Sequence, residues 1–282
     1  MERYKQVVCI TGAGSGFGLD ASLFFAKKGF QVVATVRSIE RSSYLQQRIK
    51  EEGIEEKVDV VGLDVTKQSE IVRTITSILE KHQQIDILIN NAGFAMGGFA
   101  EEISQDEWKD QFDTNFFGLV AVTQAVLPSM RKRSKGRIVN ISSISGKIAF
   151  PGMSAYAASK HAVEAYSESL RFEVKPFDID VCIVEPGSYQ TNIWSKGKKV
   201  ASRSVEPSSP YYKQYVAIEN YLKKSEPNFG PTYEVTEVIF KACTIIKPKL
   251  RYPIGKQVKL LILLKGLLPW KLWERLVVKT MK

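Results

Sequence analysis

A glycine-rich turn near the N-terminus constrains the fold of this chain more than any other feature. Gln6 to Thr11 forms a short apolar run, and glycines at 12, 14, 16 and 18 follow it. Leu19 to Lys28 then has helical periodicity, so the segment predicts a strand, a glycine turn and a helix. Such glycines let the backbone approach a diphosphate, and free N–H groups at the helix start favour an anion. A glycine turn alone could be only a tight connection, but its place between strand and helix predicts dinucleotide binding.

Strand and helix patterns alternate along the rest of the chain and indicate one large domain. The chain has 282 residues, 44% apolar and 25% charged, which suits one sizeable core. We expect a doubly wound α/β Rossmann fold with a seven-stranded, mainly parallel sheet and helices on both faces. The expected strands are residues 6–11, 31–36, 58–63, 86–89, 138–141, 180–184 and 250–253, and the expected helices include 19–28, 39–52, 67–83, 105–132 and 232–246. The single domain is expected to include residues 1–282, with a substrate lid at about 188–230 and a basic apolar tail at about 249–282.

The segment from Asn140 to Lys160 carries the candidate chemistry. The strand before Ser142 ends in a turn rich in hydroxyl groups, and the helix that follows places Tyr156 and Lys160 one turn apart on one face. A phenol with its ordinary pKa of about 10 needs roughly 4 kcal/mol of help to act as a base near pH 7. The adjacent Lys160 ammonium is expected to supply it. Ser143 can hold a substrate oxygen from the other side.

Tyr-x-x-x-Lys is a weak signal by itself, because a helix with one aromatic residue and one solvated lysine would look the same. Here it follows Thr-Gly-x-x-x-Gly-x-Gly at residues 11–18, Asn90-Asn91-Ala92-Gly93 and the turn that contains Ser143. Together these motifs resemble the short-chain dehydrogenase/reductase family, in its non-extended branch and its hydroxysteroid and retinol dehydrogenase-like members. The resemblance covers about residues 5 to 195.

That resemblance implies a set of cofactor-binding and catalytic residues. Asp64 would contact the adenine amino group, although it could equally cap the helix that starts near Lys67. Thr191 would contact the nicotinamide carboxamide, and Asn115 would hold a water that links Lys160 to solvent. An asparagine inside a helix is unfavourable, so Asn115 also predicts a local kink. The full cofactor set is Gly12, Ser15, Gly16, Phe17, Gly18, Arg37, Asp64, Val65, Asn91, Ala92, Gly93, Tyr156, Lys160, Pro186, Gly187 and Thr191.

The end of the second expected strand indicates which nicotinamide cofactor is bound. An NAD enzyme of this fold carries an acidic residue there for the ribose 2′-hydroxyl. This chain has Arg37 and Ser38 instead, with no carboxylate before Glu40 and with Arg41 as a possible second contact. An arginine fork suits a 2′-phosphate, so NADP(H) is expected in preference to NAD(H). A solvated loop arginine is the alternative.

Cysteine and histidine positions argue against a metal site. Cys9, Cys182 and Cys243 are far apart, so neither a disulfide framework nor zinc is expected, and reduced intracellular thiols are the simplest interpretation. His82 and His161 have no partner at ligand spacing. The N-terminal residues show no apolar stretch that resembles a signal peptide, so we expect a cytoplasmic protein.

The formal net charge of +10 lies mostly in the C-terminal tail rather than over the whole chain. A nucleic-acid partner is therefore not expected. The tail combines Trp270, Trp273 and the run Leu260 to Leu264 with basic residues, which suits peripheral contact with a membrane surface. Pocket closure or burial at a homo-oligomer interface is the alternative. The apolar stretches are too short to span a bilayer. The basic residues are Lys249, Arg251, Lys256, Lys259, Lys265, Lys271, Arg275, Lys279 and Lys282, against Glu274 alone.

These residues predict an NADP(H)-dependent oxidoreductase that acts on a carbonyl or a secondary alcohol. Ser143 would polarise the oxygen, Tyr156 would transfer the proton and Lys160 would bind the nicotinamide ribose. A hydrophobic substrate is expected because the lid is rich in aromatic residues, although these could merely pack the lid onto the body. A non-catalytic, NADP(H)-binding regulator on the same fold is the alternative function. The lid aromatics are Trp194, Tyr211, Tyr212, Tyr215, Tyr221 and Phe229.

Overall fold

Seven parallel strands form the centre of the molecule. The computed structural model describes residues 5–191, 193 and 198–279, so Trp194 and Lys282 lie outside the described residues. The strands follow the order β3-β2-β1-β4-β6-β7-β9 and every neighbouring pair is parallel. The order changes direction between β1 and β4, where ligands bind in open α/β sheets. The strands are β1 (Val7–Ile10), β2 (Gln31–Val36), β3 (Val58–Gly62), β4 (Ile87–Asn90), β6 (Gly136–Ile141), β7 (Ile179–Pro186) and β9 (Arg251–Ile254).

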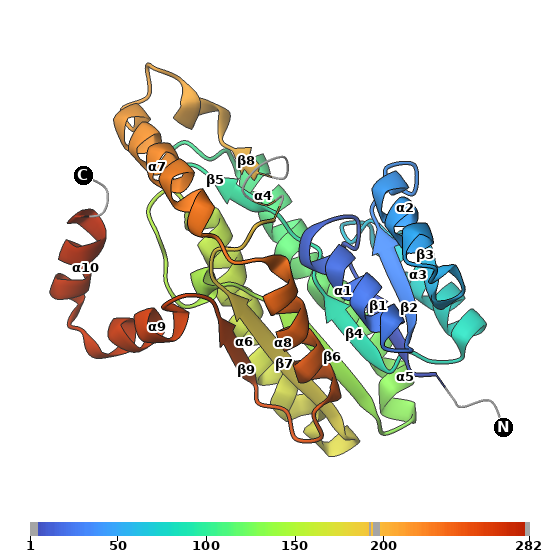
Figure 1. Ribbon diagram of the computed structural model, residues 1–282. Helices are drawn as coiled ribbons and strands as arrows, with labels where there is room; N and C mark the ends of the chain where they lie inside the picture. The colour runs from blue at the N-terminus through green and yellow to red at the C-terminus, as the bar shows by residue number, and fades with distance from the viewer. Residues whose placement is uncertain (1–4, 192, 194–197, 280–282) are drawn as a thin grey trace.

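Helices cover both faces of this sheet (Figure 1). Alternate side chains of β1 point to opposite faces: Val8 and Ile10 pack with α1, α2 and α8, whereas Val7 and Cys9 pack with α3, α5 and α6. This double burial explains why the strands read as continuous apolar runs. The expected seven-stranded fold is therefore confirmed. The helices are α1 (Gly16–Lys27), α2 (Ser43–Glu51), α3 (Gln68–His82), α4 (Gln105–Phe112), α5 (Gly118–Lys132), α6 (Ser154–Val174) and α8 (Thr232–Thr244), with short 3-10 turns at η1 (Glu55–Lys57), η3 (Ile144–Gly146) and η4 (Lys175–Phe177).

Three local predictions differ from the structure or are sharpened by it. The helix expected from residue 39 begins only at Ser43, because Ser42 Oγ donates to the Ile39 carbonyl and closes a turn first. The interpretation of Asp64 as a helix cap is wrong, since α3 has Lys67 at its N-cap and the Asp64 carboxylate accepts hydrogen bonds from Thr66. The long helix expected over 105–132 is interrupted by a π-helical segment, η2 (Asp113–Phe117), which is the kink predicted around Asn115.

A small second sheet joins the lid region to the body. Strands β5 (Ala95–Gly97) and β8 (Lys198–Val200) pair in parallel, although about a hundred residues separate them. Glu102 is buried and accepts hydrogen bonds from Ser204 (2.7 Å) and Ser209 (2.5 Å). These contacts fasten the segment before the lid helix to the body. The lid contains η6 (Ser202–Val205), α7 (Tyr212–Ser225) and η7 (Glu226–Asn228).

The C-terminal tail forms two short helices, α9 (Val258–Leu267) and α10 (Trp270–Lys279). Both extend past the β9 edge of the sheet, and α10 lies on the α7 side of the molecule (Figure 1, red). Val258 and Trp273 are buried, so the expectation that Trp273 is available to a membrane surface is wrong. Most other apolar side chains of these two helices are exposed. No helix within the described part of the chain combines the length and apolarity needed to cross a membrane.

Candidate active site

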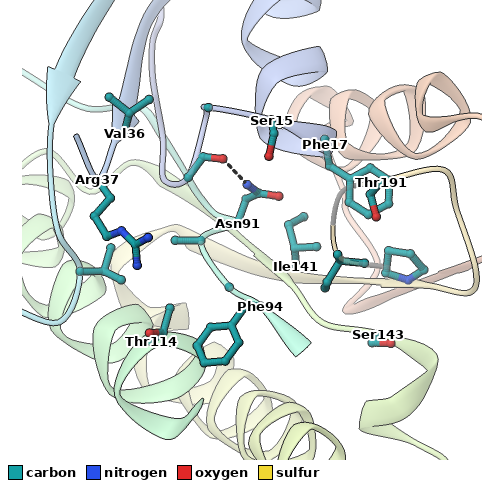
Figure 2. Close-up of a pocket in the computed structure, with 18 of the residues that line it drawn as sticks. Ser15, Phe17, Val36, Arg37, Asn91, Phe94, Thr114, Ile141, Ser143 and Thr191 are labelled. Carbon is teal, nitrogen blue, oxygen red and sulfur yellow. Dashed lines mark hydrogen bonds between the residues drawn. The ribbon is translucent and has the colours of Figure 1, made fainter. Parts of the chain in front are cut away.

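A cavity of about 560 Å³ opens at the carboxyl ends of the central strands. Its volume is within the range of ligand and cofactor pockets, about 300–1,000 Å³. Gly18 of the expected cofactor set and Asn115 of the expected catalytic set do not line it, whereas the other members of both sets do. In Figure 2, Arg37 lies at one end, Ser143 at the other, and Asn91 between them. The expected residues on the wall are Gly12, Ser15, Gly16, Phe17, Arg37, Asp64, Val65, Asn91, Ala92, Gly93, Ser143, Tyr156, Lys160, Pro186, Gly187 and Thr191.

The glycine turn is held against the end of β4 by close backbone contacts. Gly12 has φ +69°, and a Cβ there would lie 2.8 Å from Ala92 Cα. A Cβ on Gly18 would lie 2.5 Å from Asn91 Nδ2, which donates to the carbonyls of Thr11 and Gly12 (Figure 2). The Thr11 hydroxyl oxygen accepts two further hydrogen bonds, from the backbone N–H groups of Asn91 and Ala92. Only glycine therefore fits at these two positions.

The charges on the cavity wall suit a polyanion. Arg37, the first residue after β2, lines the cavity together with Arg41. Lys160 and Lys199 are the other cations, and Asp64 is the single carboxylate among the described lining residues. Glu40 is not part of the wall, and its carboxylate accepts from Ser38 Oγ at 2.6 Å. A glycine cradle with an excess of positive charge fits the anionic diphosphate that joins the two halves of a dinucleotide.

Ser143, Tyr156 and Lys160 meet at the other end of the cavity. Ser143 follows β6 and its Oγ accepts from the backbone N–H of Ser145 at 3.1 Å, so its own proton is free to be donated. The Tyr156 hydroxyl lies near enough to Ser143 for that hydroxyl to lower the pKa of Tyr156. Lys160 Nζ donates to the Ile141 carbonyl at 2.8 Å and lies 5.8 Å from the centroid of the Tyr156 ring. Tyr156 and Lys160 are both buried.

Burial controls the pKa values of these two groups. It raises the pKa of Tyr156 to about 12, against a smaller opposite effect of the Ser143 hydroxyl. It lowers the pKa of Lys160 to about 8, against the charge of Glu164. The expectation that Lys160 brings the Tyr156 pKa towards 7 is therefore not met by the protein alone. The ammonium is directed at the Ile141 carbonyl, and desolvation of the phenolate outweighs its effect.

Asn115 supports the site from behind the cavity wall. Its buried side chain accepts from the Phe94 N–H and donates to the Phe94 carbonyl, both at 3.0 Å, and it also donates to Ser159 Oγ at 3.3 Å. The side-chain amide thus connects the segment between β4 and β5 to the helix that carries Tyr156. A role for Asn115 in a water relay stays a prediction. Gly93 allows its approach, because a Cβ there would lie 3.1 Å from Asn115 Oδ1.

Several lining residues have no sequence signal that would have identified them. Phe94 and Lys199 both line the cavity and contact each other, with Lys199 Nζ 4.4 Å from the Phe94 ring centroid. Lys199 belongs to β8, and only the long-range pairing with β5 brings it to the site. Thr114 lies on the π-helical segment, which turns it towards the cavity (Figure 2). The Pro186-Gly187 turn was identified, but Tyr189, which is fully buried and packs edge-on against Phe17, was not.

Comparisons with known proteins agree with this geometry. The family model described as short chain dehydrogenase matches residues 6–200. The "Uncharacterized oxidoreductase YusZ" of Bacillus subtilis strain 168 is 40% identical over 276 residues, which cover 98% of each chain. A "3-ketodihydrosphingosine reductase" of Bacteroides thetaiotaomicron is 35% identical over 256 residues, covering 91% of this chain and 90% of that protein.

Solved structures of other proteins also resemble this chain. A short-chain dehydrogenase from Streptomyces avermitilis superposes with a TM-score of 0.83 at 32% identity and covers 99% of this chain and 100% of its own. The structure described as ElxO with NADP bound has a TM-score of 0.73 at 26% identity, covering 90% and 99%. The fold, the glycine turn and the Ser143, Tyr156 and Lys160 constellation thus lead to one assignment: the chain belongs to the short-chain dehydrogenase family and is an oxidoreductase of that family.

Proposed function

We propose that this protein is an NADP(H)-dependent oxidoreductase that interconverts a carbonyl and a secondary alcohol on a hydrophobic substrate. The observation that carries the proposal is the meeting of Ser143, Tyr156 and Lys160 at one end of a cavity whose other end presents Arg37. A screen of ketones and alcohols with both nicotinamide cofactors, followed by the absorbance of the reduced nicotinamide, tests it. No turnover of any substrate would favour the regulatory alternative.

Each residue has a proposed task. When bound, NADPH supplies the hydride that reduces the carbonyl carbon. Ser143 donates its free proton in a hydrogen bond to the carbonyl oxygen, and Tyr156 gives that oxygen a proton as negative charge develops on it. The raised pKa of Tyr156 keeps the phenol protonated across the physiological range, which suits the reductive direction. Lys160 is proposed to hold the nicotinamide ribose hydroxyls and to compensate charge on Tyr156.

NADP(H) is proposed over NAD(H) because of the position of Arg37. It follows β2 directly, where an NAD enzyme of this fold has a carboxylate, and Arg41 adds a second cation to the same part of the wall. Glu40, the nearest carboxylate in sequence, bonds to Ser38 and does not line the cavity. The relative solved with NADP bound supports this choice. Within the cofactor set, Asp64 and Val65 are proposed for the adenine and Thr191 for the carboxamide.

A hydrophobic substrate is proposed because a second, smaller hollow lies between the residues that precede the catalytic helix and the lid helix, and most of its lining is apolar apart from the Lys198–Glu219 ion pair. Met153 directly precedes α6, and together with Gly152 and Phe99 it faces Ile218 and Leu222 of α7 across a space of about 30 Å³. No residue of α7 is fully buried, so this helix packs loosely and can be displaced by a larger ligand. The relative from Bacteroides thetaiotaomicron that is named 3-ketodihydrosphingosine reductase supports this class.

Long-chain ketones are expected to be reduced with a higher kcat/KM than short polar ones. Each buried CH₂ group contributes about 0.8 kcal/mol, so six extra methylenes that enter the hollow can raise kcat/KM by 10²-fold or more. A homologous series of 2-ketones with NADPH measures the slope per methylene. Equal or better use of small polar ketones would contradict the substrate class without affecting the proposed cofactor.

Reduction is expected to become slower as the pH rises through about 8. Burial lowers the pKa of Lys160 to about 8, so its charge is present below this pH and lost above it. An unfolded lysine keeps its proton to about pH 10.4, so deprotonation of Lys160 between these values stabilises the folded state. The protein should therefore stay folded while activity is lost, and its circular dichroism should not change over this pH range. A kcat that stays constant from about pH 7 to about pH 9.5 would contradict this role of Lys160.

The tail is proposed to contact an anionic membrane surface. Leu260, Leu263, Leu267, Trp270 and Leu276 are each more than half exposed. Basic residues lie between them, and Lys265 Nζ sits 4.2 Å from the centroid of the Trp270 ring. Tryptophan beside lysine suits the headgroup region, where each basic residue adds about 1 kcal/mol.

Full-length protein is expected to sediment with anionic vesicles at low salt and to stay in solution with neutral vesicles. Changing Leu267 and Trp270 to serine should reduce the bound fraction, whereas Lys223→Glu and Lys224→Glu on the lid should have less effect. Protein that stays in the supernatant with anionic vesicles contradicts membrane contact. A dimer that the serine changes convert to monomer would instead assign the tail to a subunit interface.

A further inference from the structure

Two buried glutamates and two partly buried cations form a charged cluster next to Lys160. Glu164 follows Lys160 by one turn of α6, and Glu185 is the residue of β7 before Pro186. Lys147 follows η3, which continues from Ser143, and Arg251 begins β9. The cluster therefore joins the elements that carry the hydroxyl, the lysine and the Pro186-Gly187 turn of the proposed active site.

The two carboxylates share the same two cations. Lys147 Nζ lies 3.2 Å from Glu164 Oε2 and 4.0 Å from Glu185 Oε1. Arg251 Nε lies 3.1 Å from Glu164 Oε2 and 3.5 Å from Glu185 Oε1. Glu164 and Glu185 are 4% and 1% exposed, so both are far removed from water. Burial on this scale is tolerated only when each charge is compensated.

One oxygen of each carboxyl group lacks a hydrogen-bond donor. Across the described residues, no donor reaches Glu164 Oε1 or Glu185 Oε1. Both carboxyl groups lie within 4.0 Å of the same Lys147 ammonium, and two ionised carboxylates can only accept hydrogen bonds. A single proton between them satisfies both groups. Burial, followed by the charge of Glu164, raises the pKa of Glu185 in agreement with such a proton.

The charge that remains on the pair acts on Lys160. Two titratable groups of α6 face this ammonium, Tyr156 and Glu164, and β6 presents the neutral Ile141 carbonyl. Glu164 is the group whose charge opposes the effect of burial on Lys160. Glu164 itself is faced by Lys147, by Glu185 of β7 and by Arg251 of β9.

We propose that Glu164 and Glu185 share one proton and that the remaining negative charge keeps Lys160 in its ammonium form at physiological pH. The two glutamates are then positioning residues that set the upper pH limit of the reaction. This inference rests on the proposed role of Lys160 in the oxidoreductase. A cluster that only fastens β9 and η3 to α6 would affect stability but would leave the ionisation of Lys160 unchanged.

The test is an NMR titration of the lysine side chains in protein labelled with ¹³C at lysine Cε, with Lys160 assigned by Lys160→Arg. The wild-type midpoint for Lys160 is expected at about pH 8. Glu164→Gln should lower it by about one pH unit, because it moves the remaining charge to the more distant Glu185. Glu185→Gln should leave it unchanged, since the amide N–H replaces the shared proton and Glu164 stays charged. The alkaline limb of kcat should follow the same pattern.

Glu168→Gln is the matched control, because Glu168 also pairs with Arg251, at 2.8 Å, but is half exposed. It should leave the Lys160 midpoint unchanged. If the Lys160 titration midpoint does not shift in Glu164→Gln, the charge on the Glu164–Glu185 pair does not determine the ionisation of Lys160, and the proposal is overturned. Equal shifts in Glu164→Gln and Glu185→Gln overturn the shared proton.

If Glu164→Gln does not fold, ¹³C-labelled glutamate in the wild type tests the shared proton. One carboxyl group that still titrates above about pH 6, and that disappears in Glu185→Gln, is expected. Complete ionisation of all glutamates below that pH overturns the proposal. These titrations need neither cofactor nor substrate, so a failure of the proposed enzyme activity would leave their outcome intact, and the reverse also holds.

Discussion

Tyr156→Phe is expected to lower kcat for carbonyl reduction by 10²-fold or more while NADPH still binds with a Kd within about threefold of the wild type. The change removes only the hydroxyl that gives its proton to the substrate oxygen. Its partner Ser143 keeps its hydrogen bond from the Ser145 N–H, so the site should retain its shape. Steady-state reduction gives kcat, and fluorescence titration with NADPH gives the Kd.

Tyr166→Phe is a suitable control for this experiment. Tyr166 lies on the same helix, and burial also raises its pKa to about 12, but it does not line the cavity. It should keep kcat within a few-fold of the wild type. A Tyr156→Phe enzyme with more than a tenth of wild-type kcat, a loss below about 1.4 kcal/mol, would show that another group supplies the proton.

Arg37→Asp is expected to reverse the cofactor preference from NADP(H) to NAD(H). The wild type should show the higher kcat/KM with NADPH, because a guanidinium at the end of β2 can bind a 2′-phosphate with charge-assisted hydrogen bonds worth about 1.5–3 kcal/mol each. Aspartate repels that phosphate and accepts from a ribose hydroxyl instead. The ratio of the two kcat/KM values should therefore change by about 10²-fold or more, which parallel assays with NADPH and NADH measure.

Arg73→Asp makes the same charge change at an exposed position on α3 and should leave the ratio unaltered. If wild-type kcat/KM is equal for the two cofactors, Arg37 does not select the phosphate. A uniform loss with both cofactors in Arg37→Asp would indicate damage to the fold of the β2 end rather than a change of preference.

Local patterns were sufficient to predict the sheet and most of the cavity wall. The central strands are buried on both faces, so their apolar runs are visible in sequence, and the glycine turn and the Tyr156 helix are continuous segments. The same holds for the kink at Asn115, because an asparagine amide inside a helix needs partners that the helix itself does not offer.

Features that depend on distant residues could not be predicted. Strands β5 and β8 have three residues each, and they are stabilised by a partner about a hundred residues away, so no periodicity marks them or the position of Lys199. The suggested helix-cap role of Asp64 is wrong because its carboxylate accepts hydrogen bonds from the backbone N–H and the hydroxyl of Thr66, two residues later. The pKa of Tyr156 depends on burial, which spacing along a helix does not reveal.

The most direct test of the proposed chemistry follows an isotope from cofactor to product. NADPH that carries deuterium at its transferable position is incubated with the enzyme and the best long-chain ketone from the substrate series, and the alcohol is analysed by mass spectrometry. We predict an alcohol that carries one deuterium on the carbinol carbon, formed by the wild type at least 10²-fold faster than by Tyr156→Phe. An unlabelled alcohol, or labelled alcohol formed equally fast by both proteins, would contradict hydride transfer with proton donation from Tyr156.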